Sequence, residues 1–372
     1  MREKISKFFA SYWGIILVGA IIGILGPVLQ YLGNPPNMGI CVACFERDIA
    51  GALGLHRAGV VQYIRPEIIG FVLGSTIAAL LFREFKARAG SAPIVRFVLG
   101  VFAMIGALVF LGCPWRAGFR LAGGDMTALV GIVGLVGGIW IGVAFLRSGF
   151  NLGPSKKTYP AVGWIMPIMM IGLLLLLIFR PVFSEGGPIF FSESGPGSMA
   201  APILISLGAG LLIGFLAQRS RFCTMGAVRD VILLKDYRLL SGVVALIVVA
   251  AVTNLALGQF KFGFAGMPIA HSNILWNILG MVLAGLAYAL AGGCPGRQLF
   301  LAGEGNGDSA IFVLGMITGA AIAHNFNLAG KADAMVDGVL QVGGISQYGM
   351  IAVGIGLVVC LVIGFTMRQK TA

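Results

Sequence analysis

Four cysteines, each followed by an arginine, are the residues of this 372-residue chain best suited to chemistry. Cys113 and Cys294 stand in the motifs Gly-Cys-Pro-Trp-Arg and Gly-Cys-Pro-Gly-Arg, which end at Arg116 and Arg297. Because proline is favoured at the first position of a helix, we expect each of these cysteines to cap a short helix. The free amides of such a helix start and the arginine would bind a small anion, and the thiol would bind a soft, polarisable atom in it.

A second pair of matching segments begins at Cys41 and Cys223. In each segment the cysteine is followed six residues later by an arginine and then by an aspartate. Because an unpaired charge in apolar surroundings is costly, each aspartate is expected to pair with its arginine. The candidate site therefore consists of substrate-path residues, namely Cys41, Cys113, Cys223, Cys294, Arg116 and Arg297, and of supporting residues, namely Cys44, Arg47, Asp48, Arg229, Asp230, Pro114 and Pro295.

These residues also have a structural interpretation. A buried cysteine is often only a small apolar residue, and an arginine at the edge of an apolar segment can extend its charge to water. Four of the cysteines recur in both copies with an arginine a few residues later, which favours a functional role for them. Cys360 lies inside an apolar segment and is expected to be structural. Cys44 completes a Cys-x-x-Cys spacing with Cys41, but the second copy has Gly226 at that place, so which of the two faces the substrate stays open. The three histidines show no metal-ligand spacing, and no cofactor or metal is expected.

The motifs recur in the same order at nearly one offset along the chain. A Leu-Ala-Gly triplet at 121–123 likewise returns at 301–303. The chain is therefore interpreted as a tandem duplication, with a first transmembrane repeat at 1–190 and a second at 191–372. The junction falls near 185–199, a polar stretch with several glycines and prolines.

The composition is that of a protein whose solvent is lipid. Hydrophobic residues make up 58% of the chain and charged residues 11%, whereas a soluble protein carries roughly a quarter charged residues. The net charge of +12 resides mostly in short segments between apolar ones, as membrane topology requires, so no nucleic-acid partner is expected. No phosphate-binding loop of the GxxxxGK[ST] type occurs, which excludes transport driven by ATP hydrolysis in this chain.

Ten segments have the roughly 20 mostly apolar residues that a spanning helix needs. They lie at about 13–32, 66–84, 93–112, 126–147, 161–182, 200–218, 239–258, 273–292, 307–326 and 346–367. Five spans per repeat force the two copies into opposite orientations, which is the inverted-repeat plan of many secondary transporters. The shorter stretches 39–55 and 222–234 are expected to be re-entrant half-helices that line a cavity. The predicted fold is thus an all-α integral membrane protein with two inverted five-helix repeats.

The distribution of positive charge predicts how this fold lies in the membrane. Most of the 26 lysines and arginines fall in the segments that share one side with the N-terminus. Segments rich in these residues stay in the cytoplasm. We therefore expect a multi-pass protein of the inner (plasma) membrane with both termini cytoplasmic.

At these motifs the chain resembles the YeeE/YedE family of membrane proteins, which carry sulfur-transport domains. The resemblance rests on residues 112–116 and 293–297 and on the cysteine-containing stretches 41–48 and 223–230, and it covers nearly the whole chain. Members of the family are implicated in thiosulfate uptake, and the YedE branch is associated with selenium metabolism. The resemblance implies that the substrate passes cysteines along a narrow central path, a role that falls by motif on the four repeated cysteines.

We expect a membrane transporter, not an enzyme, that takes up a small sulfur- or selenium-containing anion such as thiosulfate. The alternative is a membrane thiol or persulfide redox enzyme that uses Cys41 and Cys44, although the second copy lacks this pair. A third interpretation is a scaffold for a soluble sulfurtransferase, for which the chain offers no sizeable soluble domain. The expected partners are the anion, the lipid bilayer and a cytoplasmic sulfur- or selenium-carrier protein.

Overall fold

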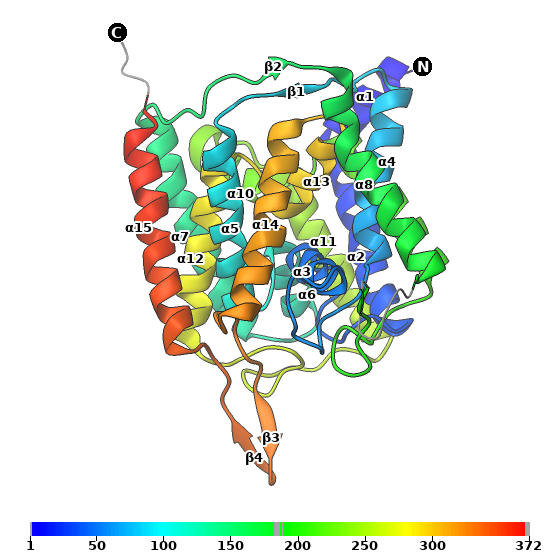
Figure 1. Ribbon diagram of the computed structural model, residues 1–372. Helices are drawn as coiled ribbons and strands as arrows, with labels where there is room; N and C mark the ends of the chain where they lie inside the picture. Colours follow the sequence, from blue (N-terminus) through cyan, green and yellow to red (C-terminus); the bar gives the residue numbers. More distant parts are fainter. Residues whose placement is uncertain (1, 182–186, 188, 369–372) are drawn as a thin grey trace.

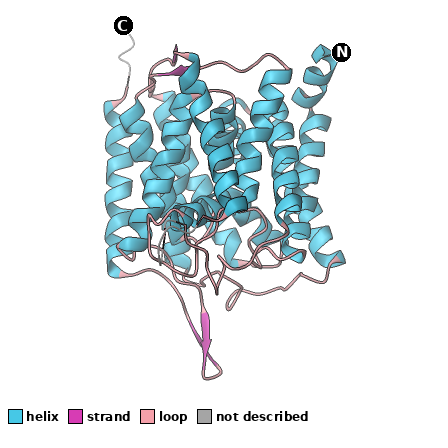
Figure 2. Ribbon diagram, turned by 45° about the vertical axis from the view of Figure 1, so that its right-hand side comes forward, coloured by secondary structure: helices cyan, strands magenta, loops and turns pink. Residues whose placement is uncertain are grey.

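The computed structural model describes residues 2–181, 187 and 189–368 as a bundle of long, roughly parallel helices (Figure 1 and Figure 2). Over these residues, nine helical segments are long and apolar enough to cross a membrane. Strands in the same part of the chain form only two short pairs. The predicted fold class, an all-α integral membrane protein, is confirmed.

The elements follow one another with short connections. The first half contributes α1 (Arg2–Ala10), α2 (Tyr12–Tyr31), α3 (Val42–Ala52), α4 (Pro66–Leu81), β1 (Arg88–Ala89), α5 (Pro93–Val109), α6 (Pro114–Ala122), α7 (Thr127–Arg147), β2 (Lys156–Lys157) and α8 (Pro160–Phe179). The second half contributes α9 (Ile203–Ser220), α10 (Thr224–Leu234), α11 (Arg238–Ala256), α12 (Ile274–Ala291), α13 (Pro295–Gly303), α14 (Gly307–Asn325), β3 (Ala334–Val336), β4 (Val339–Gln341) and α15 (Gln347–Thr366).

One of the ten predicted spans is shorter than expected. The segment predicted at 66–84 forms the 16-residue helix α4, which is about 24 Å long at 1.5 Å per residue. The hydrocarbon core of a bilayer is about 30 Å thick. The helix begins at Pro66 and is capped at Phe82, where the chain turns toward β1. The predicted count of ten is therefore corrected to nine helices of spanning length in the described part of the chain.

Each half holds two short helices, one in the predicted re-entrant stretch and one after the Cys-Pro motif, as expected from the sequence. α3 and α10 lie within the predicted stretches 39–55 and 222–234, and α6 and α13 follow the two Cys-Pro motifs. Every residue of α3 is buried. In Figure 1, α3 and α6 lie in the half of the bundle nearer the β3–β4 hairpin, and α10 and α13 lie in the half nearer the chain termini.

Long helices of the two halves pack against each other in matched pairs. α2 packs on α11 and α4 on α9; likewise α5 packs on α14 and α7 on α12. Glycines permit this close approach, because a methyl group at Gly23 would lie 2.6 Å from the carbonyl oxygen of Leu246, and one at Gly70 would lie 2.6 Å from the carbonyl carbon of Gly210. α8 and α15 depart from the pattern, since α8 packs on α4 and α15 packs on α12. The inverted orientation of the two repeats stays a prediction.

The two ends of the bundle differ. The start of α1 and the end of α15 lie at one end, which we call the termini end, and the β3–β4 hairpin projects from the opposite end, which we call the hairpin end (Figure 1). β1 pairs with β2 in antiparallel register at the termini end. The polar stretch before residue 190 lies mostly outside the described residues, so the division into 1–190 and 191–372 also stays a prediction.

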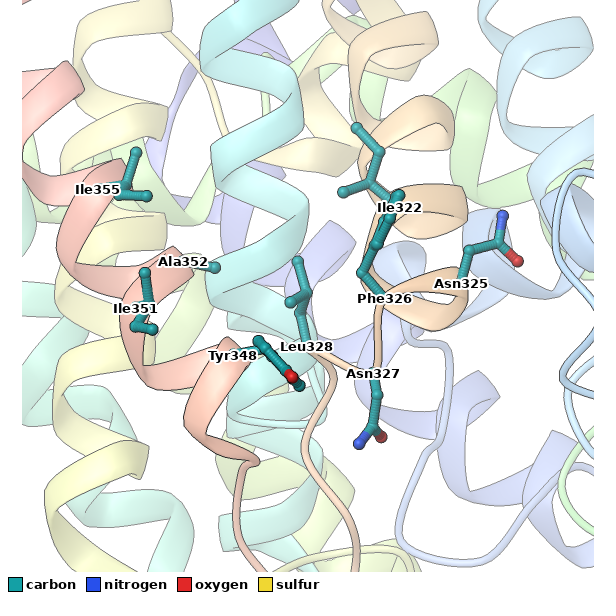
Figure 3. A pocket seen from close by; sticks show the side chains of 9 residues that line it. All are labelled: Ile322, Asn325, Phe326, Asn327, Leu328, Tyr348, Ile351, Ala352 and Ile355. Atoms are coloured by element: carbon teal, nitrogen blue, oxygen red, sulfur yellow. The ribbon is translucent and has the colours of Figure 1, made fainter.

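An apolar pocket of about 550 Å³ opens at the hairpin end between α14 and α15 (Figure 3). Phe326, Tyr348 and Ile351 are among the side chains that line it. No thiol and no charged side chain belongs to this lining, as far as the chain is described. The pocket is therefore not a candidate site for an anion.

Candidate functional site

The first cysteine pair joins the starts of α3 and α6. The Sγ atoms of Cys41 and Cys113 lie 3.9 Å apart, and both residues are fully buried. Both cysteines are N-caps, as the Cys-Pro motif predicts for Cys113. The Cys41 thiol accepts a hydrogen bond from the backbone N–H of Cys44 at 3.3 Å. Two helix N-termini therefore direct their partial positive charge toward one pair of sulfur atoms.

The second cysteine pair repeats this arrangement at the starts of α10 and α13. The Sγ atoms of Cys223 and Cys294 lie 3.7 Å apart. Cys223 accepts hydrogen bonds from the backbone N–H of Gly226 at 3.2 Å and of Cys294 at 3.5 Å. All six cysteines of the chain are free thiols. The structure thus brings the four repeated cysteines together as two reduced pairs.

Cys44 lies within hydrogen-bonding reach of Cys41 and contacts Arg116 of the Cys-Pro motif as well. Its thiol donates to the backbone carbonyl of Leu111 at 3.8 Å and accepts a hydrogen bond from Nη1 of Arg116 at 3.4 Å. The thiol of Cys41 also contacts that of Cys113, at 3.9 Å. Cys44 therefore lies beside the first pair, in contact with the arginine of the other motif. Cys360 is buried in α15, which packs at the periphery on α12 and α5.

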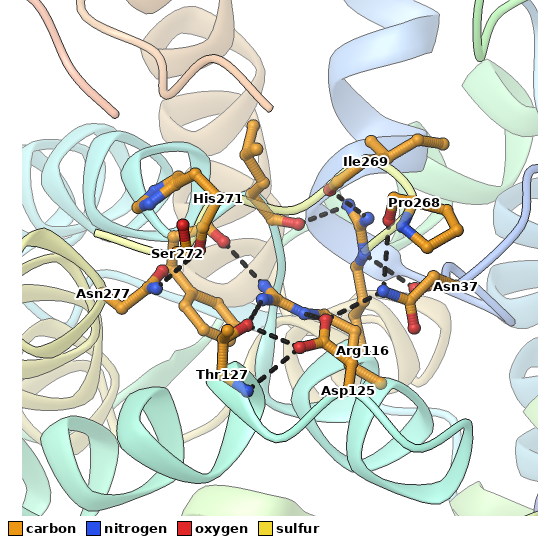
Figure 4. Close-up of polar contacts among 12 residues, drawn as sticks. Asn37, Arg116, Asp125, Thr127, Pro268, Ile269, His271, Ser272 and Asn277 are labelled. Atoms are coloured by element: carbon orange, nitrogen blue, oxygen red, sulfur yellow. Dashed lines mark hydrogen bonds and ion pairs between the residues drawn. The ribbon is translucent and has the colours of Figure 1, made fainter. Parts of the chain in front are cut away.

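The guanidinium group of Arg116 is bound by backbone carbonyls. Nε donates to Asn37 at 3.2 Å, Nη2 donates to Ile269 at 2.7 Å, and Nη1 donates to Leu111 (Figure 4). In the described part of the chain, no carboxylate forms an ion pair with Arg116. Its positive charge therefore remains uncompensated beside the first cysteine pair, although its donors are occupied. An anion beside the first pair would therefore experience the electric field of Arg116 rather than direct hydrogen bonds from it.

A buried ion pair behind Arg116 was not predicted. Arg120 and Asp125 are fully buried and lie 2.8 Å apart, and Thr127 bonds to both side chains. Asn37, whose carbonyl binds Arg116, also donates to Asp125 at 2.9 Å (Figure 4). The signal in the sequence was two charges in a largely apolar segment. By the offset of the Leu-Ala-Gly triplet, the second copy has Phe300 and Gly305 at the matching places, so the repeated motifs do not mark these two charges.

The expected pairing of arginine with aspartate is confirmed in both copies. Asp48 pairs with Arg47 at 2.7 Å and also with Arg65 at 2.7 Å, and all three side chains are buried. Asp230 pairs with Arg229 at 2.8 Å near the surface. These four supporting residues therefore fix α3 and α10 rather than contact the thiols.

A pocket of about 530 Å³ at the termini end reaches the second cysteine pair. Its lining includes Cys223 itself, the carboxylates of Glu84 and Asp230, and five arginines, namely Arg219, Arg221, Arg229, Arg238 and Arg297. Partial burial raises the pKa of Glu84, but hydrogen bonds from Arg219 and Gln218 and the charge of Arg221 outweigh it and hold the pKa below its ordinary value. Glu84 is thus ionised at neutral pH, and the lining still carries an excess of positive charge.

Arg297 lies between this pocket and the core. Its Nη1 lies 3.6 Å from Glu304, which also pairs with Arg221 at 2.7 Å. The Nη1 atom has no hydrogen-bond partner within the described chain. Unlike Arg116, Arg297 therefore keeps a free donor that can reach an anion beside Cys223.

A second pocket, of about 320 Å³, lies at the hairpin end. Arg47, His324 and Lys331 line it together with Leu111, whose carbonyl accepts from both Cys44 and Arg116. The pocket at the termini end thus reaches Cys223, and the pocket at the hairpin end reaches Leu111, which contacts Cys44 and Arg116.

Aromatic side chains pack around Trp115 of the first Cys-Pro motif. The ring of Trp115 lies 5.7 Å from those of Phe71 and Phe222 and 6.2 Å from that of Phe300. Several buried polar atoms in this region have no hydrogen-bond partner in the described structure, namely Trp115 Nε1, Thr224 Oγ1, Tyr288 Oη and Gln298 Oε1. Unsatisfied buried polar groups are rare in folded proteins. In this region the unsatisfied polar atoms would be available to form hydrogen bonds with a polar ligand near the two cysteine pairs.

Known proteins resemble the chain in part. The family described as Sulphur transport matches residues 219–372. Two proteins named thiosulfate transporter TsuA align with it: that of Escherichia coli strain K12 is 36% identical over 110 residues, and that of Spirochaeta thermophila is 37% identical over 100 residues. The aligned stretches cover 29% and 26% of this chain and 30% of each relative. The family resemblance predicted from the cysteine motifs is confirmed over residues 219–372, which match the sulphur transport family.

Proposed function

We propose that the protein is a membrane transporter that carries a small sulfur-containing anion of the thiosulfate class past its two cysteine pairs. The observation that supports this most directly is the repeated geometry of reduced thiols at helix starts, with sulfur–sulfur distances of 3.9 Å and 3.7 Å. The partial matches to two thiosulfate transporters and the sulphur transport family support the same class of substrate.

The chemistry of the substrate follows from what lines the path. Thiosulfate carries a soft terminal sulfur at one end and hard oxygen atoms at the other. Thiols donate weak hydrogen bonds to sulfur or oxygen, and helix N-termini with arginine stabilise negative charge. Sulfate has the charge but no soft atom, so the thiols would give it no advantage. Selenosulfate, in which selenium replaces the terminal sulfur, would fit the same groups.

The proposed path runs from the pocket at the hairpin end to the pocket at the termini end. An anion would pass Arg47 and Lys331, then the Cys41–Cys113 pair, and then Trp115. It would next meet the Cys294–Cys223 pair and leave among the arginines of the second pocket. The four thiols are at most 5% exposed, so the described state is closed at its centre. Passage therefore requires small movements of the aromatic side chains.

The redox enzyme that would use Cys41 and Cys44 receives less support, because the second copy has Gly226 in place of Cys44. The sulfur of Cys44 contacts Leu111 and Arg116, and the sulfur of Cys41 contacts Cys113. Uptake across an inner membrane with cytoplasmic termini, delivery to a cytoplasmic carrier protein and use of selenium compounds belong to the proposal. Arginines are concentrated at the termini end. Because segments rich in positive charge face the cytoplasm, this end favours release of the anion there.

Uptake by the purified protein in sealed lipid vesicles tests the proposal. Vesicles with the protein should take up ³⁵S-thiosulfate faster than protein-free vesicles, and unlabelled thiosulfate and selenosulfate should compete. Sulfate at the same concentration should not compete, because it lacks the soft atom. Equal competition by sulfate would contradict a selective role of the thiols, and an absence of thiosulfate uptake would contradict the function itself.

A further inference from the structure

Glu46 is a buried carboxyl group for which the cysteine path provides no role. The residue is 1% exposed, and neither of its carboxyl oxygens has a hydrogen-bond partner within the described structure. It lies on α3, two residues after Cys44 and immediately before the paired Arg47. The second copy has Val228 at the matching place. The acid therefore occurs in the first copy only, and the second copy has an apolar side chain at the same place.

The charged and titratable groups on the elements around α3 have other partners. α3 packs against α14, α5, α4 and α13. His324 of α14 stacks on His56, Arg96 of α5 donates to Ser91 and Ala291, Glu67 of α4 accepts from Asn34, and Arg297 of α13 faces Glu304. At the far end of α14, Asp308 binds Ser155 and the amides of Gly90 and Ser91. Within the described residues, Glu46 thus has no cation that forms an ion pair with it.

An ionised carboxylate in such a place would be very unfavourable. Removing an isolated charge from water into an apolar interior costs several kcal/mol even after the protein relaxes, and an intramembrane acid without a partner takes up a proton instead. Glu46 is therefore neutral in the closed state that the structure describes. Its carboxyl group then carries a hydroxyl donor that is not used.

The unused donor belongs to the same interior region as the thiols. Tyr288 of α12 is fully buried, and its hydroxyl has no hydrogen-bond partner in the described chain. This hydroxyl lies within electrostatic reach of Glu46, Cys113, Cys294 and Cys41. The acid, the tyrosine and both cysteine pairs therefore share one desolvated interior, in which the charge of an anion and the charge of Glu46 would act on each other strongly.

We propose that Glu46 carries one proton with each anion, so that the protein is a proton-coupled symporter. The proposal rests on the proposed function. An anion entering the interior would be repelled by ionised Glu46, whereas the neutral acid can donate a hydrogen bond to it. Glu46 takes its proton from water on the side where the anion enters. After the anion has left, the neutral carboxyl group releases that proton to water on the opposite side when the interior opens there. Water then stabilises the carboxylate, which takes up the next proton on the side where the anion enters. No covalent bond is formed to the anion, and the proton is the same before and after the cycle.

Two measurements on the same vesicles separate passage of the anion from its coupling to protons. In counterflow, unlabelled thiosulfate inside exchanges with ³⁵S-thiosulfate outside at equal pH. In driven uptake, the outside is one pH unit more acid, and potassium with valinomycin holds the membrane potential at zero. One proton per anion can then support at most about tenfold accumulation, since one pH unit corresponds to a factor of ten. The wild-type protein is expected to show both counterflow and accumulation.

The variant Glu46→Gln keeps a neutral hydrogen-bond donor of the same shape but cannot release a proton. It is expected to retain counterflow and to lose accumulation altogether, so that the inside concentration stops at the outside value. Glu67→Gln is the matched control, because Glu67 is also a buried acid but accepts a hydrogen bond from Asn34. This control is expected to accumulate thiosulfate as the wild type does.

Each other outcome also decides the question. Wild-type counterflow without pH-driven accumulation would overturn the coupling and leave the proposed function standing. Absence of wild-type counterflow would overturn both. Accumulation by Glu46→Gln at the wild-type level would show that another group carries the proton. If Glu46→Gln lost counterflow as well, the variant Glu46→Asp, which keeps an acid, would decide. Accumulation by Glu46→Asp would support the proposal. Counterflow without accumulation, or loss of both, would overturn it.

Discussion

Trp115 and Gly296 occupy matching positions in the two Cys-Pro motifs, and they lie against each other in the structure. A methyl group at Gly296 would lie 3.4 Å from Cζ2 of the Trp115 ring. The indole therefore fills the space that a side chain of the second motif would need. Phe222 and Phe300 also lie against this ring. From these contacts with residues of the second copy, we infer that Trp115 lies between the two cysteine pairs.

A larger side chain at position 296 should obstruct the path. Gly296→Leu would push Trp115 toward the cysteines, and overpacking of this kind costs about 1–3 kcal/mol. We expect a strong loss of thiosulfate uptake at normal membrane insertion, whereas Gly296→Ala should retain most of it. Gly137→Leu is the control, because a side chain at Gly137 would meet open space. Wild-type uptake by Gly296→Leu would contradict the separation of the two pairs by Trp115.

Replacement of Cys44 distinguishes a carrier from a thiol enzyme. The Cys44 thiol contacts Leu111 and Arg116, and the second copy has Gly226 in its place. Cys44→Ala should therefore keep much of the uptake, and all thiols of the wild type should stay reduced during transport, as measured by alkylation and mass spectrometry. Complete loss of uptake together with a substrate-dependent disulfide between Cys41 and Cys44 would favour the enzyme.

The ion pairs beside the two re-entrant segments should differ in their effect on stability. Arg65 is fully buried, pairs with Asp48 and donates to the carbonyls of Met199 and Pro196. Removal of one partner from a buried pair destabilises a protein by about 3–5 kcal/mol, so Arg65→Met should lower the Tm in detergent markedly. Arg229→Met, at a partly exposed pair, should cost about 1 kcal/mol or less. Equal shifts in Tm for the two variants would contradict the assigned role of burial.

The orientation of the bundle can be measured with reporter fusions. Ser192 accepts a hydrogen bond from the backbone N–H of Gln62 at the hairpin end, and the C-terminus follows α15 at the termini end. We expect a reporter at Lys370, which lies outside the described residues, to be cytoplasmic and one at Ser192 to be periplasmic. The same side for both fusions would contradict the arrangement of the spans.

Local signals in the sequence predicted the parts of the site that depend on local structure. The Cys-Pro motif predicted the N-cap position of Cys113 and Cys294, and adjacency in sequence predicted the pairing of Asp48 with Arg47. The sulfur–sulfur contacts could not be predicted, because they depend on how separate helix starts meet in space. The hydrogen bonds of Arg116 to the carbonyls of Asn37 and Ile269 could not be predicted either, because these residues come from distant segments.

Comparison of the two copies also hid part of the site. Charges that occur in one copy only, such as Arg120, Asp125 and Glu46, carry no signal of repetition, although they are fully buried. A search for charged residues inside apolar segments would have found them, since such residues are rare in membrane proteins and usually have a function.

The central claim is that the anion passes the thiol of Cys113 and then that of Cys294. Uptake by the double variant Cys113→Ser, Cys294→Ser tests this claim most directly. Serine keeps a hydroxyl donor but lacks the soft sulfur. Loss of two contacts of about 1 kcal/mol each should lower the initial rate of thiosulfate uptake roughly thirtyfold. Cys360→Ser, in the peripheral helix α15, should transport at the wild-type rate. Full uptake by the double variant, at equal protein in the membrane, would contradict the account.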